Sequence, residues 1–531
     1  MKKTPLSLAI VLVLITIAGI AVRWIGLAGH VTYIDEMIVL AGGRWNVAGR
    51  EDQPRSSGPI EFARKIAESP ESSYAPLQFA LTYFLVGDDP LTPDGLYRSR
   101  IVSAAIGSLS LPLFLLCAWR SCRKRVGLAL LTPLTFFCFS LMQIINTQQN
   151  HSYIAGVTFA MLSILCFDQA RVHSGISART LWLTIPGLFP LINYQLLLVN
   201  AALGSVLIAT WIAEWWNRDK SPRGLISIGV PPILLGILTL TAAAALAHLK
   251  SDLSVTWWVS HFGFQGDFVH AVLSLPRKFF DIFHAVLMVS RMHELNNLSA
   301  ALMGSCLVAG IPTLWIRRVD RAPQTLFYLH SAFAILGVFT ALFFLKQIPL
   351  SPSRHMLILT PMLLLAMFHV LRELEIRAEQ WRFSRFIRIS YILLPLVVAA
   401  SFFAQYPGFI RESREMLNPE IVRKVARDTG TRTIVTGHWD YNKVYCLLNE
   451  EVRDGMFDIL SIKDQSQFPR EHFLLVGHYP EVFRSIYEMR SDTPYQSNLI
   501  VHDVREYDIE PSPYVRYWEN RLFIWHVRPV E

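Results

Sequence analysis

Two adjacent carboxylates, Asp35 and Glu36, are the residues of this chain that most directly suggest chemistry. They follow closely after a long apolar segment, residues 6–22, and carboxylates near a bilayer cost free energy unless they have a partner or a function. A carboxylate in a polar loop can act as a general base toward a hydroxyl, or it can hold a divalent cation. A helix cap or an ion pair with Arg44 explains the pair equally well from the residues alone.

A second polar group is the run Asn-Thr-Gln-Gln-Asn-His-Ser-Tyr at residues 146–153, between two apolar segments. Its amide side chains and its histidine offer donors and acceptors of the kind that bind sugar hydroxyls. The residues concerned are Gln148, Gln149, His151 and Tyr153. An ordinary solvated turn is the alternative interpretation.

Cationic side chains stand where other apolar segments begin or end. Arg100 precedes one such segment, Arg354 and His355 precede another, and Lys346 lies between two. An arginine can bind a phosphate through two parallel hydrogen bonds, which makes these positions candidates for a phosphate site. The alternative for Arg354 is a side chain that extends to lipid headgroups.

The elements that must position these residues are membrane helices. With 52% hydrophobic and 17% charged residues in 531, the chain has the composition of a polytopic α-helical membrane protein. About eleven segments approach the ~20 residues that span a bilayer. The predicted spans are 6–22, 101–119, 127–146, 152–168, 180–197, 199–214, 225–247, 298–316, 325–345, 356–372 and 389–405, with 180–214 forming one long helix or two that turn near Asn200.

The basic residues predict the orientation. Loops around 120–125, 171–179, 218–223, 317–321 and 372–388 are rich in arginine and lysine and fall on one side of the predicted spans. Because cytoplasmic loops carry this excess, we expect a multi-pass membrane protein with a cytoplasmic N-terminus. The net charge of +8 then reflects these loops, so nucleic acid is not an expected partner.

The predicted domains are a transmembrane domain over 1–405 and a small α/β domain over 406–531 on the outer, extracytoplasmic side. The outer loops would be 23–100 and 248–297, and the apolar stretch 75–87 is too short to span and suggests a helix at the interface. A helix is also expected over 60–68. In the tail, the pattern predicts strands at 433–436, 473–476 and 522–527 and helices at 420–428 and 480–489.

In their order along the chain, these motifs resemble those of the bacterial relatives of protein O-mannosyltransferases and of the lipid A aminoarabinose transferase, glycosyltransferases with the C-type membrane fold. The matching stretches are Tyr33-Ile34-Asp35-Glu36, Tyr74-Ala75-Pro76-Leu77, Arg100-Ile101-Val102-Ser103-Ala104, residues 147–153 and Arg354-His355. The chain departs from the family pattern in three of these motifs. Tyr74-Ala75 replaces His-Pro, His151 stands where arginine is usual, and His355 replaces tyrosine.

The resemblance implies an inverting transfer of a sugar from a polyprenyl-phosphate donor to an acceptor hydroxyl at the outer, periplasmic face of the bacterial inner membrane. Asp35 would be the general base and Glu36 would assist it. Binding of the donor phosphate falls to Arg100, Arg354, His355 and Lys346, and substrate contacts fall to Tyr74, Gln148, Gln149, His151 and Tyr153. Besides membrane lipids, the expected partners are the lipid-linked sugar and an acceptor that is a lipid, a glycan or a protein.

Other classes remain open at this point. A non-catalytic transporter or flippase of lipid-linked sugars is the main alternative, although it predicts internal repeats that the chain lacks. A receptor with an acidic tail and a ligase for lipid-linked oligosaccharides are further alternatives. The six cysteines have neither disulfide nor metal-ligand spacing. No metal-binding residues are therefore assigned and no cofactor is predicted, with a divalent cation left open as the one candidate.

Overall fold

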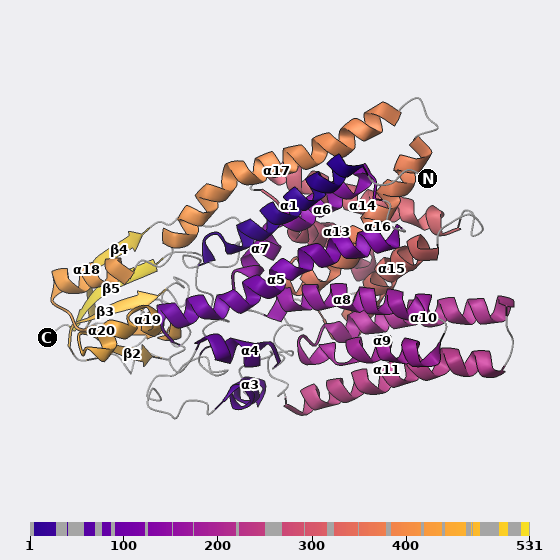
Figure 1. Cartoon of the computed structure of the whole chain (residues 1–531). Coiled ribbons are helices and arrows are strands. Elements are labelled where there is room, and N and C mark those ends of the chain that lie inside the picture. The colour runs from indigo at the N-terminus through magenta and orange to yellow at the C-terminus, as the bar shows by residue number, and fades with distance from the viewer. Residues whose placement is uncertain are drawn as a thin grey trace. The chain divides into compact units, whose positions relative to one another are not determined.

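The structure is a computed structural model, drawn in Figure 1. It describes residues 5–27, 40, 58–68, 77–86, 91–122, 126–150, 152–173, 175–218, 222–249, 268–290, 292–315, 323–348, 350–378, 384–415, 419–437, 441–462, 469, 471–477, 499–507 and 522–529. The predicted helix over 480–489 lies outside these residues.

Most of the described chain is helical. The α-helices are α1 (Leu6–Trp24), α3 (Pro59–Glu68), α4 (Leu77–Val86), α5 (Pro93–Ser121), α6 (Leu131–Phe139), α7 (Leu141–Thr147), α8 (Ser152–Val172), α9 (Ile176–Gly187), α10 (Leu196–Arg218), α11 (Pro222–Leu249), α13 (Phe268–Val286), α14 (His293–Trp315), α15 (Pro323–Phe344), α16 (Thr360–Ala378), α17 (Ser384–Glu415), α18 (Pro419–Thr429), α19 (Tyr441–Leu447) and α20 (Asn449–Arg453). Short 3₁₀ helices are η2 (Leu128–Leu130), η3 (Phe189–Leu191) and η4 (Arg354–Leu359). The strands are β1 (Thr433–Gly437), β2 (Asp458–Ile462), β3 (Phe473–Gly477), β4 (Leu499–Tyr507) and β5 (Leu522–Pro529).

The prediction of a polytopic helical protein is confirmed. Within the described residues, eight helices are long and apolar enough to cross a membrane, or up to nine if the bent pair α6 and α7 makes one span. Helix α11 covers the predicted span 225–247 over its whole length. The short apolar stretch expected at 75–87 forms α4, and the helix expected over 60–68 forms α3.

Two compact units make up the chain. One comprises Met1–Ile25, Ser73–Gln78 and Ser103–Gln405, and the other comprises Gly26–Ser72, Phe79–Val102 and Tyr406–Glu531. The division into domains at residues 405 and 406 stays a prediction. In the first unit α8, α9, α10 and α11 run alongside one another, as Figure 1 shows.

Helix α16 is the buried centre of the first unit. From Met362 to Phe368 every side chain is at most 2% exposed, because α6, α8, α14 and α15 all pack against this helix. Helices α1 and α17 instead expose large apolar residues such as Leu14 and Leu396. Apolar side chains on the outside of a helix bundle are the surface that lipid tails would cover.

The predicted span 127–146 is broken at Ser140. Helices α6 and α7 meet there at an angle of 46°, and Ser140 has an extended backbone. Its hydroxyl caps α7 by accepting a hydrogen bond from the Gln143 backbone N–H at 3.4 Å, and it donates to the Val286 carbonyl at 2.8 Å. A carbonyl far along the chain therefore stabilises the break at Ser140, which the apolar composition of this segment does not predict.

The chain between α9 and α10 turns earlier than predicted. The turn covers residues 188–195, and Asn200 lies inside α10 rather than at the turn. Pro186 and Pro190 explain the position, because a proline lacks the N–H that would continue a helix. The Asn200 side chain donates to the Pro186 carbonyl at 2.7 Å, so this amide closes the end of α9 from the neighbouring helix.

The C-terminal part of the second unit contains a five-stranded sheet of order β2-β1-β3-β5-β4. Strands β2, β1 and β3 are parallel, whereas β5 is antiparallel to both of its neighbours, β3 and β4. Helix α18 packs Val422 and Val425 against Ile434 and Leu474 of the sheet. The strands expected at 433–436, 473–476 and 522–527 are confirmed as β1, β3 and β5, and the helix expected at 420–428 is confirmed as α18.

Candidate functional site

Arg354, His355 and Tyr153 meet at one end of the helix bundle. The Tyr153 hydroxyl lies 3.3 Å from Nε2 of His355, and the two rings pack edge to face with centroids 4.8 Å apart. The Arg354 guanidinium carbon lies 5.3 Å from the centroid of the same phenol ring. An aromatic face attracts a cation, so the Tyr153 ring favours this position of Arg354, whereas His355 is held by the ring contact and the hydrogen bond.

Local structure explains how Arg354 and His355 reach this position. Ser353 is extended and precedes η4, which begins at Arg354. The Met356 N–H bonds to the Ser353 carbonyl at 2.9 Å and starts the 3₁₀ turn. Arg354 and His355 are half-buried, whereas Tyr153 is buried in the first turn of α8.

The turn between α9 and α10 supports this cluster. Gln195 donates from Nε2 to the His355 carbonyl at 3.0 Å, and Asn193 donates from Nδ2 to the Ser152 carbonyl at 2.9 Å. Asn193 also accepts the Gln195 backbone N–H at 2.9 Å. The turn thus links the start of α8 to the start of η4.

Asn193 and Gln195 were missed at the level of the sequence. Both fall inside the predicted span 180–197, where polar amides are unusual. Polar residues within a membrane segment indicate a function or a specific partner, and this signal identifies them in retrospect.

The two glutamines of the 146–153 turn have different environments. Gln148 is buried, and its Nε2 donates to the carbonyls of Val22 and Ile25 at 3.0 and 2.7 Å. Gln149 is also buried, and its Nε2 has no hydrogen-bond partner in the described part of the chain. Because a buried amide normally has a partner, Gln149 is the better candidate for contact with a ligand.

Arg100 and Lys346 have different surroundings. Arg100 is fully buried and donates from Nη1 to the Leu27 carbonyl at 3.1 Å. It therefore holds the chain that leaves α1. Lys346 is exposed just beyond the end of α15, and its backbone is left-handed with φ of 57°.

Four predicted site residues lie outside the described residues, namely Asp35, Glu36, Tyr74 and His151. No group of three or more His, Cys, Asp or Glu side chains that could hold a metal ion occurs among the residues that are described. A divalent cation at Asp35 stays a candidate.

A buried ionic cluster occupies the opposite end of α8 from Tyr153. Asp168 is 3% exposed, and its Oδ1 lies 2.8 Å from Nη2 of Arg171 while its Oδ2 lies 3.8 Å from Nε of Arg120. In the predicted topology this is the cytoplasmic end. The cluster ties α5 to α8 and contains none of the predicted site residues.

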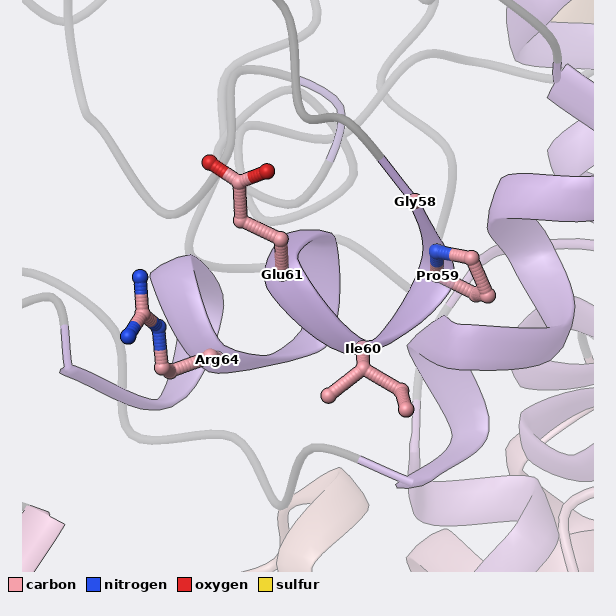
Figure 2. A pocket seen from close by; sticks show the side chains of 5 residues that line it. All are labelled: Gly58, Pro59, Ile60, Glu61 and Arg64. Carbon is pink, nitrogen blue, oxygen red and sulfur yellow. The ribbon is translucent and has the colours of Figure 1, made fainter.

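A hollow of about 400 Å³ lies at the beginning of α3. Figure 2 shows its lining, which is Gly58, Pro59, Ile60, Glu61 and Arg64. Glu61 pairs with Lys65 at 3.2 Å along the same helix. No predicted site residue lines the hollow, and its short helical rim offers few groups for a substrate.

Comparisons with known proteins give one kind of match. No protein-family model and no curated protein matches the chain. Among solved structures, the chain is similar to ArnT from Cupriavidus metallidurans bound to undecaprenyl phosphate, with 12% identity over 97% of each chain and a TM-score of 0.45. It is similar to the apo state of that protein with 12% identity over 98% of each chain and a TM-score of 0.35.

Proposed function

We propose that the chain is a membrane glycosyltransferase with the C-type fold that uses a polyprenyl-phosphate sugar as donor. The observation that carries the proposal is the contact of Arg354 and His355 with Tyr153. Tyr153, from the stretch 147–153, and the pair Arg354-His355 belong to two motifs that match the family pattern separately, and they form one basic and aromatic cluster. A half-buried guanidinium beside a polar turn suits the phosphate of a lipid whose tail lies in the membrane.

In the proposed reaction, the Asp35 carboxylate takes the proton of an acceptor hydroxyl. The acceptor oxygen then bonds to the anomeric carbon from the face opposite the phosphate, and the bond between that carbon and the phosphate oxygen breaks. The electron pair leaves with the polyprenyl phosphate, so the configuration at the anomeric carbon inverts. Glu36 assists by orienting the groups around Asp35.

Arg354 offsets the charge that develops on the leaving phosphate. A fixed cation in a site of low dielectric stabilises such charge more than water does, because it needs no reorganisation during the reaction. The Tyr153 ring and the bond between Gln195 and the His355 backbone restrict where this cation can lie. His355 can donate a second hydrogen bond to the same phosphate.

The test uses membranes that contain the full chain and a panel of polyprenyl-phosphate sugars. We expect release of polyprenyl phosphate coupled to sugar incorporation, and a loss of at least about a hundredfold in Asp35→Asn. Asp94→Asn is the matched control, because Asp94 is an exposed carboxylate paired with Arg98 at 2.7 Å. Transfer by Asp35→Asn at the wild-type rate would contradict the assignment of the base. Movement of intact lipid-linked sugar between leaflets without cleavage would support the transporter instead.

A further inference from the structure

The two arginines beside Asp168 have buried donors without a partner. Arg171 binds the carboxylate through Nη2 at 2.8 Å, and its side chain is only 8% exposed. Nε of Arg120 lies 3.8 Å from the same carboxylate, which is too long for a hydrogen bond. The Nε atoms of both arginines are buried and have no hydrogen-bond partner among the described residues. Because buried donors normally have one, these two N–H groups indicate an acceptor that the described residues do not supply.

Tyr328 of α15 adds a third such group. Its side chain is 2% exposed, and its hydroxyl has no hydrogen-bond partner in the described part of the chain. The phenol lies within electrostatic range of Asp168, Arg171 and Arg120. The ring centroid of the neighbouring Phe327 lies 5.7 Å from the guanidinium carbon of Arg171, which connects the beginning of α15 to the end of α8. Three helices, α5, α8 and α15, therefore contribute unpartnered donors to one region.

The Tyr328 ring is held in its orientation by α16. His369 of this helix stacks on the phenol, with ring centroids 5.0 Å apart and an angle of 17° between the planes. His369 is itself 1% exposed, and both of its ring nitrogens are buried without a hydrogen-bond partner among the described residues. Because α15 and α16 pack along each other, the direction of the Tyr328 hydroxyl is set by this packing.

Positive charge is in excess in this region. Arg120 and Arg171 carry two positive charges, and Asp168 carries one negative charge. Neither arginine forms another ion pair among the described residues. A buried charge without compensation is costly, so an anion gains more here than a water molecule, which supplies hydrogen bonds but no charge. Three donors and one excess positive charge match a phosphate diester, whose free oxygens carry one negative charge and only accept hydrogen bonds.

We propose that Arg120, Arg171 and Tyr328 form a binding site for the phosphate of an anionic lipid headgroup, at the end of α8 opposite to Tyr153. Inorganic phosphate presents the same oxygens, but the place of the site favours the lipid. The helices α5, α8 and α15 are each apolar enough to cross a membrane, and the Arg120 side chain is 36% exposed at the end of α5. Basic pockets between membrane helices bind lipid headgroups on the cytoplasmic side, which is this end in the predicted topology.

The test measures lipid binding to the full chain in an uncharged detergent, and it is independent of sugar transfer. The probe is phosphatidylglycerol, and diacylglycerol, which has the tails but no phosphate, is the matched lipid. We expect phosphatidylglycerol to raise the midpoint of thermal unfolding in a saturable way, because a ligand of the folded state stabilises it, and diacylglycerol to leave it unchanged. Inorganic phosphate should bind at least about tenfold more weakly, since it has no tails to bury.

Tyr328→Phe is the most informative variant, because the hydroxyl has no protein partner to lose. Without lipid, the unfolding midpoint should stay the same or rise, since an unpartnered buried hydroxyl is removed. The apparent Kd for phosphatidylglycerol should rise by at least about tenfold, which corresponds to one hydrogen bond to a charged group. Tyr391→Phe is the matched control. The Tyr391 hydroxyl already donates to the Leu371 carbonyl at 2.7 Å, so its loss should lower the midpoint and leave the Kd unchanged.

Arg120→Gln tests the charge. The close pair of Asp168 and Arg171 remains, so the variant should fold, and its apparent Kd for phosphatidylglycerol should rise by at least about tenfold. Arg377→Gln removes an exposed arginine of α16 that pairs with Glu373, and it should change the Kd by less than about twofold. An equal effect of the two substitutions means that the lipid is attracted to basic residues in general, which overturns the site.

Three further results contradict the proposal. If phosphatidylglycerol leaves the wild-type midpoint unchanged, the cluster does not bind a lipid phosphate. If inorganic phosphate binds as tightly as phosphatidylglycerol, the site takes free phosphate and the assignment to a headgroup is wrong. If Tyr328→Phe lowers the midpoint without lipid as much as Tyr391→Phe does, the Tyr328 hydroxyl is already bonded within the protein and is not available to a ligand.

Discussion

Tyr153 and His355 lie 202 positions apart in the sequence and meet edge to face, with 3.3 Å between the phenol oxygen and Nε2 of the imidazole. Arg354 lies over the same phenol ring. A single aromatic side chain at the start of α8 therefore organises both basic residues at the start of η4.

Substitution of Tyr153 should separate its two contributions. Tyr153→Phe keeps the ring beneath Arg354 and loses the hydroxyl, whereas Tyr153→Leu loses both. A cation and an aromatic ring attract each other by about 0.5–2 kcal/mol. We therefore expect the rate of sugar transfer to fall modestly in Tyr153→Phe and to be about tenfold lower again in Tyr153→Leu. Transfer rates with a saturating lipid donor measure the difference, and equal rates for the two variants would contradict a role for the ring.

Removing the positive charge of Arg354 should slow the reaction more than replacing its guanidinium by the ammonium group of lysine. Arg354→Lys keeps a cation, and Arg354→Gln does not, so we expect a loss in kcat/KM of about a hundredfold for Gln and a smaller loss for Lys. Arg377→Gln is the control, because Arg377 forms an exposed pair with Glu373 at 3.1 Å on α16. Steady-state kinetics check the order, and equal effects of Arg354→Gln and Arg377→Gln would argue against a role for Arg354 in binding phosphate.

Asp168→Asn should destabilise the protein without a direct effect on the site. The substitution leaves the Arg171 charge buried beside a neutral amide, and breaking a buried ion pair costs about 3–5 kcal/mol. Thermal unfolding in detergent measures the loss. Asp94→Asn, which removes an exposed carboxylate, should unfold like the wild type, and similar midpoints for both variants would show that the buried cluster contributes little.

Gly19→Ala should disturb the contact between α1 and α6. A Cβ at Gly19 would come within 2.8 Å of Cys138 and 2.9 Å of Leu111, closer than packed atoms allow, so a loss of about 1–3 kcal/mol in unfolding free energy is expected. At Gly236 of α11 no atom of the described residues lies within 4 Å of the same Cβ, and Ala there should stabilise the helix by about 0.5–1 kcal/mol. Thermal unfolding of the pair tests the prediction, which fails if both substitutions shift the midpoint alike.

Glu375→Gln should weaken the start of η2, the 3₁₀ turn that leads into α6. The carboxylate of Glu375 accepts the backbone N–H groups of Leu128 and Ala129 at 3.1 and 3.2 Å, where the partial positive charge of a helix beginning favours an anion. An amide keeps one acceptor and loses the charge, so we expect a loss of about 0.5–2 kcal/mol. Glu373→Gln, on the same helix and paired at the surface with Arg377, serves as the control, and an equal effect there would argue against the cap.

Much of the fold follows from composition along the chain. Apolar runs long enough to span a bilayer identify α1, α5, α8, α14, α15, α16 and α17, because such runs have few other stable environments. Alternation and buried apolar runs identify β1 and β3. The breaks at Ser140 and at residues 188–195 were harder to predict, since their partners come from residues far along the chain, such as the Val286 carbonyl and the Asn200 amide.

For the candidate site too, the sequence identified some residues but not the contacts that they make. Residue types alone selected Arg354, His355, Tyr153 and Gln148, because cations and amides beside apolar spans are costly without a function or a partner. Their roles could not be assigned from type, since a buried amide binds a ligand or a helix end equally well. Asn193 and Gln195 were not selected, because they fall inside a predicted span and residue type alone does not show what a buried amide binds.

The sequence by itself determined that this chain is a polytopic helical protein with a small C-terminal sheet, and which polar residues stand at the ends of its apolar segments. These properties depend on local hydropathy and on neighbouring residues. Only the tertiary structure decided that His355 meets Tyr153, that Gln148 bonds to the end of α1, and that Arg23 bonds to the end of α6. Each of these contacts joins groups more than a hundred residues apart, and the packing of whole helices brings them within hydrogen-bond distance.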